Sequence, residues 1–345
     1  MSRFESGGGL LTATEFTWRD GERTIHFRAG VIADSPEIIA GAGWDDYELL
    51  TTERAIGNAS VALAEDAVAV HHVPPGPINE VAGRVIDDVS TPSLVALGGG
   101  RVIDAAKAIA AVRGGRVAAL PTTLSGAEMT AIHRLPEGAE APGGLIRPEI
   151  VLADPPVMTT LPEQRLRASA MNALAHGADS LSTPFANPVA ELAALRGASL
   201  IARALDAERA RRDPAALALG SILGAYAIDS ARFALHHVVS QTLVRTLRLP
   251  HAETNATMLP LTMAALIPRA GPQMTALARA LRCKRAALAA RIEELGGGPR
   301  RLSELGAERD GIDEAVAAML ARPELALTPE PPDAGELRGL VEAAW

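Results

Sequence analysis

The sequence predicts an α/β N-terminal domain with a Rossmann-like parallel sheet, followed by an all-α helical domain. Three observations support this prediction. The chain has 345 residues, more than a single hydrophobic core usually supports. Its first 150 or so residues alternate short apolar runs with helical patterns, which is typical of βαβ units. After Pro155-Pro156 the pattern changes to long Ala- and Leu-rich stretches with few strand signals.

In the N-terminal part, short apolar or alternating runs bounded by turn residues predict strands, and longer periodic stretches predict helices. Strands are expected at residues 24–30, 47–52, 67–73, 93–97 and 117–120. Helices are expected at 58–65, 80–88 and from about 102 to 113, where Arg113-Gly114-Gly115 provides a stop.

In the C-terminal part, helices are expected at 165–182, 188–206 and 214–239, with more to follow. The segments 296–299 and 328–333 are expected to be loops within that domain. With the break at about 152–157, the predicted domains are 1–154, a nucleotide-binding domain, and 155–345, a substrate and catalytic domain.

Composition excludes several classes of protein. The net charge of −8 argues against a nucleic-acid surface, which needs clustered Lys and Arg. The single cysteine, Cys283, rules out a disulfide framework or a Cys-based zinc site within the chain. The first 16 residues lack the apolar stretch of a signal peptide, and we find no run of about 18 apolar residues. We therefore expect a soluble, cytoplasmic protein that binds neither nucleic acid nor membrane.

Three glycines, Gly98-Gly99-Gly100, stand between a predicted strand and a predicted helix. Such glycines let backbone N–H groups approach a pyrophosphate, and the helix N-terminus favours its negative charge. The motif is not GxGxxG, so a tight turn without a ligand is the alternative. Asp104 and Lys107 either form an ordinary i,i+3 ion pair or orient the cofactor end of the helix.

A second cofactor segment follows the next strand, in the sequence PTTLSGAE from Pro121 to Glu128. The hydroxyls of Thr122, Thr123 and Ser125 suit contacts with phosphate or a nicotinamide amide. The alternative is a capped turn that enters a helix, with Ser125 and Glu128 in capping-box spacing. Glu53, just after an early strand, is placed to meet an adenosine ribose and would favour NADH over NADPH.

Four side chains predict a site in the helical domain. Asn172 and His176 stand at i and i+4 of one helix and so share a face. His237 and His251, fourteen residues apart, are the other members of the set. A carboxylate at 172 would complete an Asp/His/His/His set for a divalent transition metal, but the residue there is a neutral amide. Taken alone, each of these histidines could instead be an ordinary packing or surface residue. The histidines of the first domain lack such partners, and we interpret them as structural or peripheral.

These motifs resemble the iron-containing alcohol dehydrogenase superfamily, which includes glycerol dehydrogenase-like and dehydroquinate synthase-like relatives. GGGRVIDAAK is similar to its GGGSxxDxAK phosphate loop, PTTLSGAE to its PTTxxTGSE-like segment, and NALAH to its DAxxH metal segment. The spacing from His237 to His251 also matches, and the resemblance extends from about residue 50 to 281. It implies the dehydroquinate synthase-like fold, a nicotinamide cofactor and a homodimer.

Within the superfamily, PTTLSGAEMT, SAMNALAHGADSL, ALHHVVSQTL and LPHAETN are most similar to the maleylacetate reductase branch, which shares the Asn at 172 and is regarded as not needing a metal. The resemblance implies NAD(P)H-dependent reduction of maleylacetate to 3-oxoadipate in aromatic degradation. Asn172, His176, His237 and His251 are then the catalytic donors in place of a metal. Arg245, Arg248 or another basic residue would hold a substrate carboxylate.

Two other functions stay open at this point. Three histidines and a water suffice for zinc, so a metal-dependent alcohol dehydrogenase is the first alternative. A member of the fold that has lost catalysis is the second. Arg101, Gln241 and Asn255 depart from the family pattern, and the last two are expected near the substrate.

Overall fold

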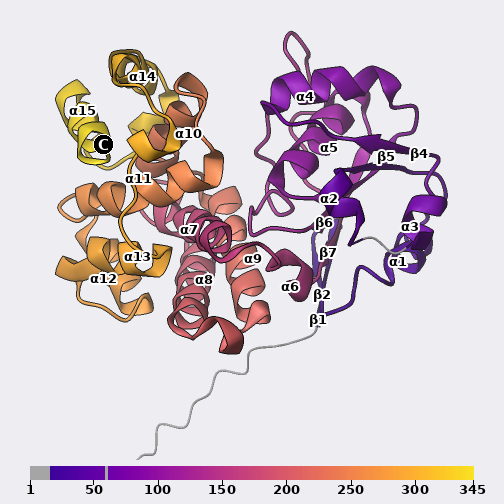
Figure 1. Cartoon of the computed structure of the whole chain (residues 1–345), viewed down its shortest axis with the longest axis horizontal. Coiled ribbons are helices and arrows are strands. Elements are labelled where there is room, and N and C mark those ends of the chain that lie inside the picture. Colours follow the sequence, from indigo (N-terminus) through magenta and orange to yellow (C-terminus); the bar gives the residue numbers. More distant parts are fainter. Residues whose placement is uncertain (1–15, 59–60) are drawn as a thin grey trace, which may run out of the picture.

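The computed structural model describes residues 16–58 and 61–345, and within them a seven-stranded sheet forms the centre of the N-terminal half (Figure 1). The strands lie in the order β1-β2-β7-β6-β5-β3-β4; β1 is antiparallel to β2 and all other neighbouring strands are parallel. They are β1 (Phe16–Asp20), β2 (Arg23–Phe27), β3 (Glu48–Thr51), β4 (Ala69–His72), β5 (Ser93–Gly98), β6 (Arg116–Pro121) and β7 (Ile150–Ala153). The predicted parallel sheet is confirmed.

Two strands were absent from the sequence prediction. The β1–β2 hairpin turns at Gly21-Glu22, where Gly21 has φ +63°, so the sequence does hold a two-residue hairpin signal with glycine at the first turn position. Strand β7 has only four residues and lies where the prediction placed the domain break. The helix expected at 58–65 is also different: α2 (Glu53–Ile56) precedes it, α3 (Val61–Glu65) covers its end, and residues 59–60 lie outside the described part.

Helices cover both faces of the sheet because its central strands are buried on both sides. In β5, Leu94 and Ala96 pack with the helices of one face, whereas Val95 and Leu97 pack with those of the other. The first face carries α4 (Ile78–Val85), η1 (Ile86–Asp88) and α5 (Gly100–Arg113), and the second carries α1 (Ser35–Gly41), α2 and α3.

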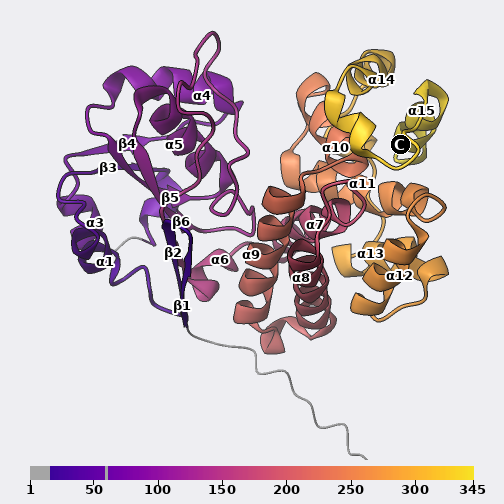
Figure 2. The same ribbon diagram turned by 180° about the vertical axis from the view of Figure 1, so that it is seen from behind.

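The C-terminal half is helical, and it lies beside the sheet in both views (Figures 1 and 2). Its helices are α6 (Pro155–Met158), α7 (Glu163–Ser180), α8 (Pro188–Asp206), η2 (Arg209–Arg211), α9 (Pro214–Ala231), α10 (Leu235–Thr246), α11 (His251–Leu266), α12 (Gly271–Ala280), η3 (Arg285–Ala287), α13 (Leu288–Gly296), η4 (Ser303–Leu305), η5 (Arg309–Gly311), α14 (Ile312–Leu320), η6 (Pro323–Leu327) and α15 (Ala334–Ala343). Helix α9 is long and apolar enough to cross a membrane, but 61% of it is buried inside the protein, as in a core helix.

The single helix expected at 214–239 is wrong, because the chain breaks between α9 and α10. Arg232 has φ +62°, a left-handed conformation that ends α9, and Ala234 is not helical either. No Gly or Pro marks this break, so local sequence gave no sign of it. The break starts a new helix at Leu235, directly before His236 and His237.

The long segment 122–149, between β6 and β7, is attached to the helical half. The N–H of Leu124 donates to Ser169 Oγ on α7 at 3.1 Å, and the N–H of Ala131 donates to Asp229 Oδ1 on α9 at 2.8 Å. Arg147 forms an ion pair with the same carboxylate. The segment that carries the predicted cofactor hydroxyls is therefore held by both halves.

Candidate active site

The glycine loop lies at the carboxyl end of β5 and opens α5. Gly98 is the last residue of the strand, Gly99 is the N-cap and Gly100 is the first helical residue. A Cβ at Gly99 would lie 3.1 Å from the side chain of Thr123, and one at Gly100 would lie 3.0 Å from that of Ser125. The glycines thus let the two loops meet at the free N–H groups of a 14-residue helix, a cradle that fits a pyrophosphate.

The predicted hydroxyl segment is brought to the same place. Gly98 pairs with Pro121 in the sheet, and the N–H of Thr122 donates to the Gly98 carbonyl at 3.0 Å. The capping-box alternative is wrong, because residues 122–130 form bends and turns and no helix follows Ser125. Its Oγ meets only the N–H of Ala127, at 3.4 Å.

Asp104 and Lys107 form the i,i+3 ion pair, with Nζ and Oδ1 2.8 Å apart. Lys107 is fully buried, and its Nζ also donates to the carbonyls of Ala127, Thr130 and Ile132 at 2.9–3.1 Å. Because its three N–H donors are all used within the protein, Lys107 holds the segment after Ser125 in place and has no N–H left to donate to a ligand.

Glu53 begins α2 directly after β3, the neighbour of β5, and its side chain is exposed. The chain goes outward from β3 to β4 and then returns to β5, so β3 and β5 flank a switch point of the sheet. Ligands of open α/β sheets bind in such a crevice, at the carboxyl ends of the strands.

Asn172 and His176 lie on one face of α7, as predicted, and both are buried (3% and 8% exposed). The amide of Asn172 donates to the Ser125 carbonyl at 3.4 Å, while its Oδ1 meets no hydrogen-bond donor in the described part of the chain. A Cβ added to Gly126, which has φ +74°, would lie 3.0 Å from His176 Nδ1. The cofactor segment therefore rests directly on these two side chains.

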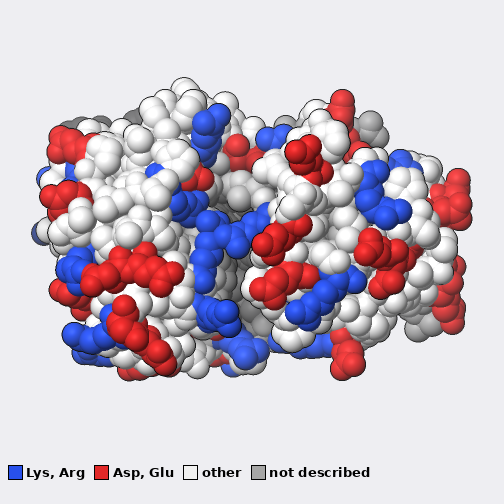
Figure 3. All heavy atoms as spheres, turned by 90° about the horizontal axis from the view of Figure 1, so that it is seen from above, with Lys and Arg blue, Asp and Glu red and all other residues white. Residues whose placement is uncertain are grey.

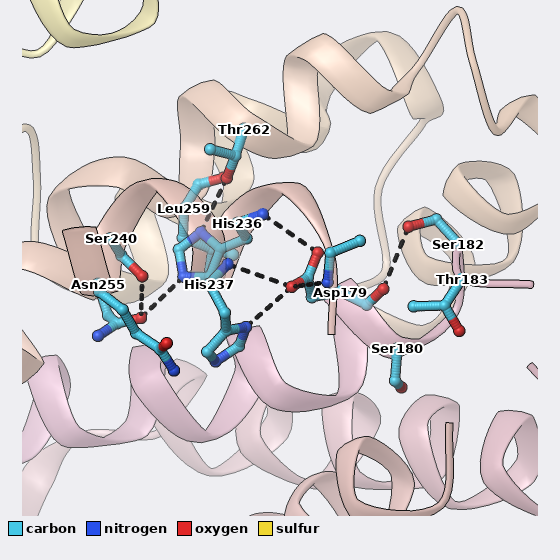
Figure 4. Close-up of polar contacts among 12 residues, drawn as sticks. Asp179, Ser180, Ser182, Thr183, His236, His237, Ser240, Asn255, Leu259 and Thr262 are labelled. Carbon is cyan, nitrogen blue, oxygen red and sulfur yellow. Dashed lines mark hydrogen bonds and ion pairs between the residues drawn. The ribbon is translucent and has the colours of Figure 1, made fainter. Parts of the chain in front are cut away.

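His237 is held by a carboxylate that the sequence analysis did not single out, Asp179 of α7. Its Oδ2 lies 2.9 Å from His237 Nδ1, and both side chains are buried. The Asp179 carboxylate also accepts the backbone N–H groups of Ala234, His236 and His237 at 2.9–3.2 Å (Figure 4). It thus caps α10 at the break described above.

The same contacts set the protonation of Asp179 and the tautomer of His237. Burial alone would raise the pKa of Asp179, but its hydrogen bonds, first of all that with His237, lower it overall. An ionised Asp179 requires a proton on His237 Nδ1. The other nitrogen, Nε2, is buried and has no partner among the described residues, so it is the atom of His237 left for a ligand.

His236, next in sequence, has no free nitrogen. Its Nδ1 and Nε2 lie 2.9 Å from Thr262 Oγ1 and Asn255 Oδ1, respectively. Burial, followed by His237, lowers the pKa of His236 to about 3, so the ring is neutral. Asn255 is fully buried in this contact and also donates to the His251 carbonyl, so it supports two of the histidines.

His176, His237 and His251 lie close enough to affect one another. The rings of His176 and His237 stack, with centroids 5.1 Å apart and 16° between their planes. Burial, then His237 and His251, holds the pKa of His176 well below its usual range. His251 begins α11 and keeps an exposed edge. Its pKa is also lowered, mainly by desolvation from the surrounding protein and next by the charge of His237. Both rings are neutral hydrogen-bonding groups at neutral pH.

As they are arranged here, these side chains do not form a ready metal site. In the described part of the chain no three His, Cys, Asp or Glu side chains are grouped as a metal site. A ring nitrogen directs its lone pair within the ring plane, so the nearly parallel planes of His176 and His237 do not converge on one ion. Asn172 adds no negative charge to offset the charge of a cation.

Comparison with known proteins gives one consistent family. The model described as the Fe-containing alcohol dehydrogenase family, C-terminal, matches residues 167–345. Maleylacetate reductase 1 of Rhodococcus opacus is 32% identical over 293 residues, covering 81% of this chain and 80% of that protein. Maleylacetate reductase of Sphingobium indicum is 30% identical over 317 residues, covering 87% and 89%.

Solved structures agree. The maleylacetate reductase of Agrobacterium tumefaciens superposes with a TM-score of 0.83 at 28% identity, covering 96% of this chain and 97% of that one. An iron-containing alcohol dehydrogenase of Corynebacterium glutamicum superposes with a TM-score of 0.81 at 29% identity, covering 93% and 94%. The predicted fold class is confirmed by these similarities.

Proposed function

The chain belongs to the iron-containing alcohol dehydrogenase family of oxidoreductases, and from this premise we propose that it reduces the carbon–carbon double bond of maleylacetate, giving 3-oxoadipate. We further propose NAD(P)H as cofactor, no metal requirement, a cytoplasmic homodimer, a role in aromatic degradation, and a division into domains 1–154 and 155–345. The observation that carries the proposal is the free Nε2 of His237, held by Asp179 beside the segment that packs on the glycine loop.

When bound, NAD(P)H supplies the hydride. The cradle of Gly99 and Gly100 would hold its pyrophosphate, with Thr122, Thr123 and Ser125 alongside and Glu53 at the adenosine ribose. Asp104 and Lys107 keep α5 and the segment after Ser125 in register.

Reduction of an enone needs a hydride at the carbon β to the ketone and a proton at the α carbon. The π electrons move onto the carbonyl oxygen, which becomes an enolate oxygen before the proton arrives. A preorganised donor to such an oxygen typically contributes about 2.7–4 kcal/mol. In the proposal, His176 and His251 act as neutral donors, and Asn172 positions the cofactor segment through Ser125 while its second amide proton stays available.

His237 is the residue we assign to proton transfer. Of the three histidines, it is the one whose Nδ1 meets an ionised carboxylate, and this partner stabilises an imidazolium. Its Nε2 would then donate the proton that converts the enolate to the ketone, at a net consumption of one proton per double bond.

The test is oxidation of NADH and of NADPH in the presence of maleylacetate, with simple aldehydes and ketones as competing substrates, before and after EDTA. The proposal predicts that maleylacetate is the best substrate by a wide margin in kcat/KM and that EDTA has no effect. Preference for a simple alcohol or aldehyde, with activity lost in EDTA and restored by zinc or iron, would establish the metal-dependent alternative instead. Light scattering of the purified protein tests the dimer.

A further inference from the structure

Three arginines from different parts of the chain gather beside the histidines. Arg134 comes from the segment between β6 and β7, Arg245 from the last turn of α10, and Arg322 from the residue before η6. Desolvation, and next the charge of Arg322, lowers the pKa of Arg134; desolvation, then Arg134 and Arg322, lowers that of Arg245. Figure 3 shows Lys and Arg gathered along the hollow between the two halves of the molecule.

Direct contacts connect this arginine cluster, Arg134, Arg245 and Arg322, to the proposed active site. The guanidinium of Arg322 lies 5.5 Å from the ring centroid of Phe233, and that ring lies 5.7 Å from the ring of His237. Arg245 is also close enough to His251 to lower its pKa further. The cluster therefore borders the histidines, at a different place from the glycine loop.

The charges of the cluster are not balanced by the protein. Arg322 is held by Glu324, with N–O distances of 3.2 Å, and by Gln241 Oε1 at 3.0 Å. Within residues 16–58 and 61–345, the guanidinium groups of Arg134 and Arg245 form no hydrogen bond or ion pair. Three guanidinium groups thus share one carboxylate, although the whole chain has a net charge of −8.

Gathering like charges in a partly desolvated hollow raises the free energy of the unliganded protein, and an anion that enters removes this cost. Guanidinium groups bind carboxylates in a bidentate, directional way, which favours a carboxylate over a diffuse counterion. Since Arg134 belongs to the sheet side and Arg245 to the helical side, one carboxylate between them would contact both walls.

We propose that Arg134 and Arg245 bind one carboxylate of a dicarboxylate substrate, and that Arg322, fixed by Glu324 and Gln241, positions them. The inference rests on the proposed function and deepens it by assigning the residues that bind one of the two carboxylates of the substrate. Of the two residues left open by the sequence, both of which are exposed, Arg245 takes this role because it is the one that lies close to Arg134 and Arg322. Gln241 accepts a hydrogen bond from Arg322, so in this proposal it acts through that residue.

The probe is hexanedioate, a saturated six-carbon diacid that cannot be reduced, titrated by calorimetry into the NADH-bound enzyme. The controls are hexanoate, which has a carboxylate at one end only, and 1,6-hexanediol, which has none. The variants are Arg134→Gln, Arg245→Gln and, as a charge-matched control, Arg211→Gln, an exposed position in η2 outside the cluster. Circular dichroism melting checks the fold of each variant, and Arg245→Lys tests for partial rescue.

We expect both the diacid and hexanoate to bind wild type better than the diol, because one carboxylate is enough to contact Arg134 and Arg245. Loss of one charged hydrogen-bonding group should weaken diacid binding about 10- to 100-fold in each cluster variant and less than about twofold in Arg211→Gln. Diacid binding that is absent from wild type, or equal in wild type and both cluster variants, overturns the inference. Weakened binding of NADH itself, with diacid affinity unchanged, overturns it too, since the arginines would then serve the cofactor.

The proposed substrate can fail independently. If the arginine variants lose the diacid but wild type does not reduce maleylacetate, the carboxylate site stands and the proposed reaction is wrong. If both are right, Arg245→Gln raises KM for maleylacetate by a similar factor while kcat changes by only a fewfold, because the group acts away from the reacting bond.

Discussion

The two walls of the cleft hold their functional groups in different ways. On the sheet side, the groups are backbone N–H donors and hydroxyls of two consecutive loops, set by glycines that permit close approach. On the helical side, they are buried imidazoles, and one carboxylate, Asp179, holds His237 and the first turn of its helix at once. The first wall is organised by local chain geometry, and the second by contacts between segments 55–58 residues apart.

This difference has an energetic consequence. A loop whose donors are backbone N–H groups is stable in contact with water, and it binds an anion through the dipoles of those N–H groups. A buried ionised carboxylate is stable only while all of its hydrogen-bond donors remain in place. We therefore expect substitutions on the helical wall to have larger effects than substitutions on the glycine wall.

His237 gives the largest expected effect, and its neighbour His236 provides the control. His237→Gln removes the group with the free Nε2, so we expect kcat to fall about 100- to 1000-fold. Because the Nδ1 donor to Asp179 is lost as well, the melting temperature should also fall. His236→Gln breaks only core hydrogen bonds, so it should lower the free energy of unfolding by about 1–3 kcal/mol and leave kcat within a fewfold. Steady-state kinetics and urea unfolding measure both, and equal losses of kcat would contradict the assignment.

Asp179→Asn is expected to have the next largest effect. The amide cannot serve as an ionised acceptor for His237 Nδ1, so activity should fall about 10- to 100-fold, and the free energy of unfolding should drop as well. Asp229→Asn is the matched control, since that carboxylate also accepts a backbone N–H and pairs with an arginine. If kcat falls as much in Asp229→Asn as in Asp179→Asn, the loss is caused by loosening of the segment 122–149 and not by a change at His237.

Glu128 allows a test on the sheet side through pH. Burial raises the pKa of Glu128 from 4.5 to about 7. The native state thus binds this proton more tightly than the unfolded state, so the contribution of Glu128 to stability falls as the pH rises from about 4.5 to 7. In Glu128→Gln the slope in this window should vanish, and stability at pH 8 should rise by on the order of 2 kcal/mol. Chemical unfolding at a series of pH values measures this, and parallel curves for both proteins would refute it.

Gly100→Ala gives the smallest expected effect. The added Cβ would lie 3.0 Å from Ser125, so the two loops must move apart by a few tenths of an ångström. We expect KM for NADH to rise about tenfold with kcat nearly unchanged. Gly83→Ala, on α4, is the control because its Cβ would meet Pro136 at an ordinary 3.9 Å. Unchanged cofactor affinity in Gly100→Ala would remove the glycine loop from the cofactor site.

The sequence predicted one wall better than the other, for the same physical reason. The βα units, the glycine loop and the hydroxyl segment are local patterns, and the structure brings them together. Asn172 and His176 were placed by helical periodicity alone. The break before Leu235 and the contact of His237 with Asp179 depend on tertiary packing, which local patterns do not contain. One signal for Asp179 was available, since it stands three residues after His176 on the same helix.

The arginine cluster was unpredictable for a similar reason. Arg134, Arg245 and Arg322 are separated by long stretches of chain, and nothing in the local sequence distinguishes Arg245 from Arg248. Only their arrangement in the fold shows which of them lack a partner within the described residues.

The central claim is that histidine and amide donors, organised by Asp179, perform the reduction without a metal ion. The most direct test is the rate of maleylacetate reduction by one protein sample before chelation, after EDTA, and after addition of zinc or iron, with metal content measured at each step. The account predicts one constant rate and substoichiometric metal throughout. A rate that collapses in EDTA and returns with one equivalent of metal would contradict it.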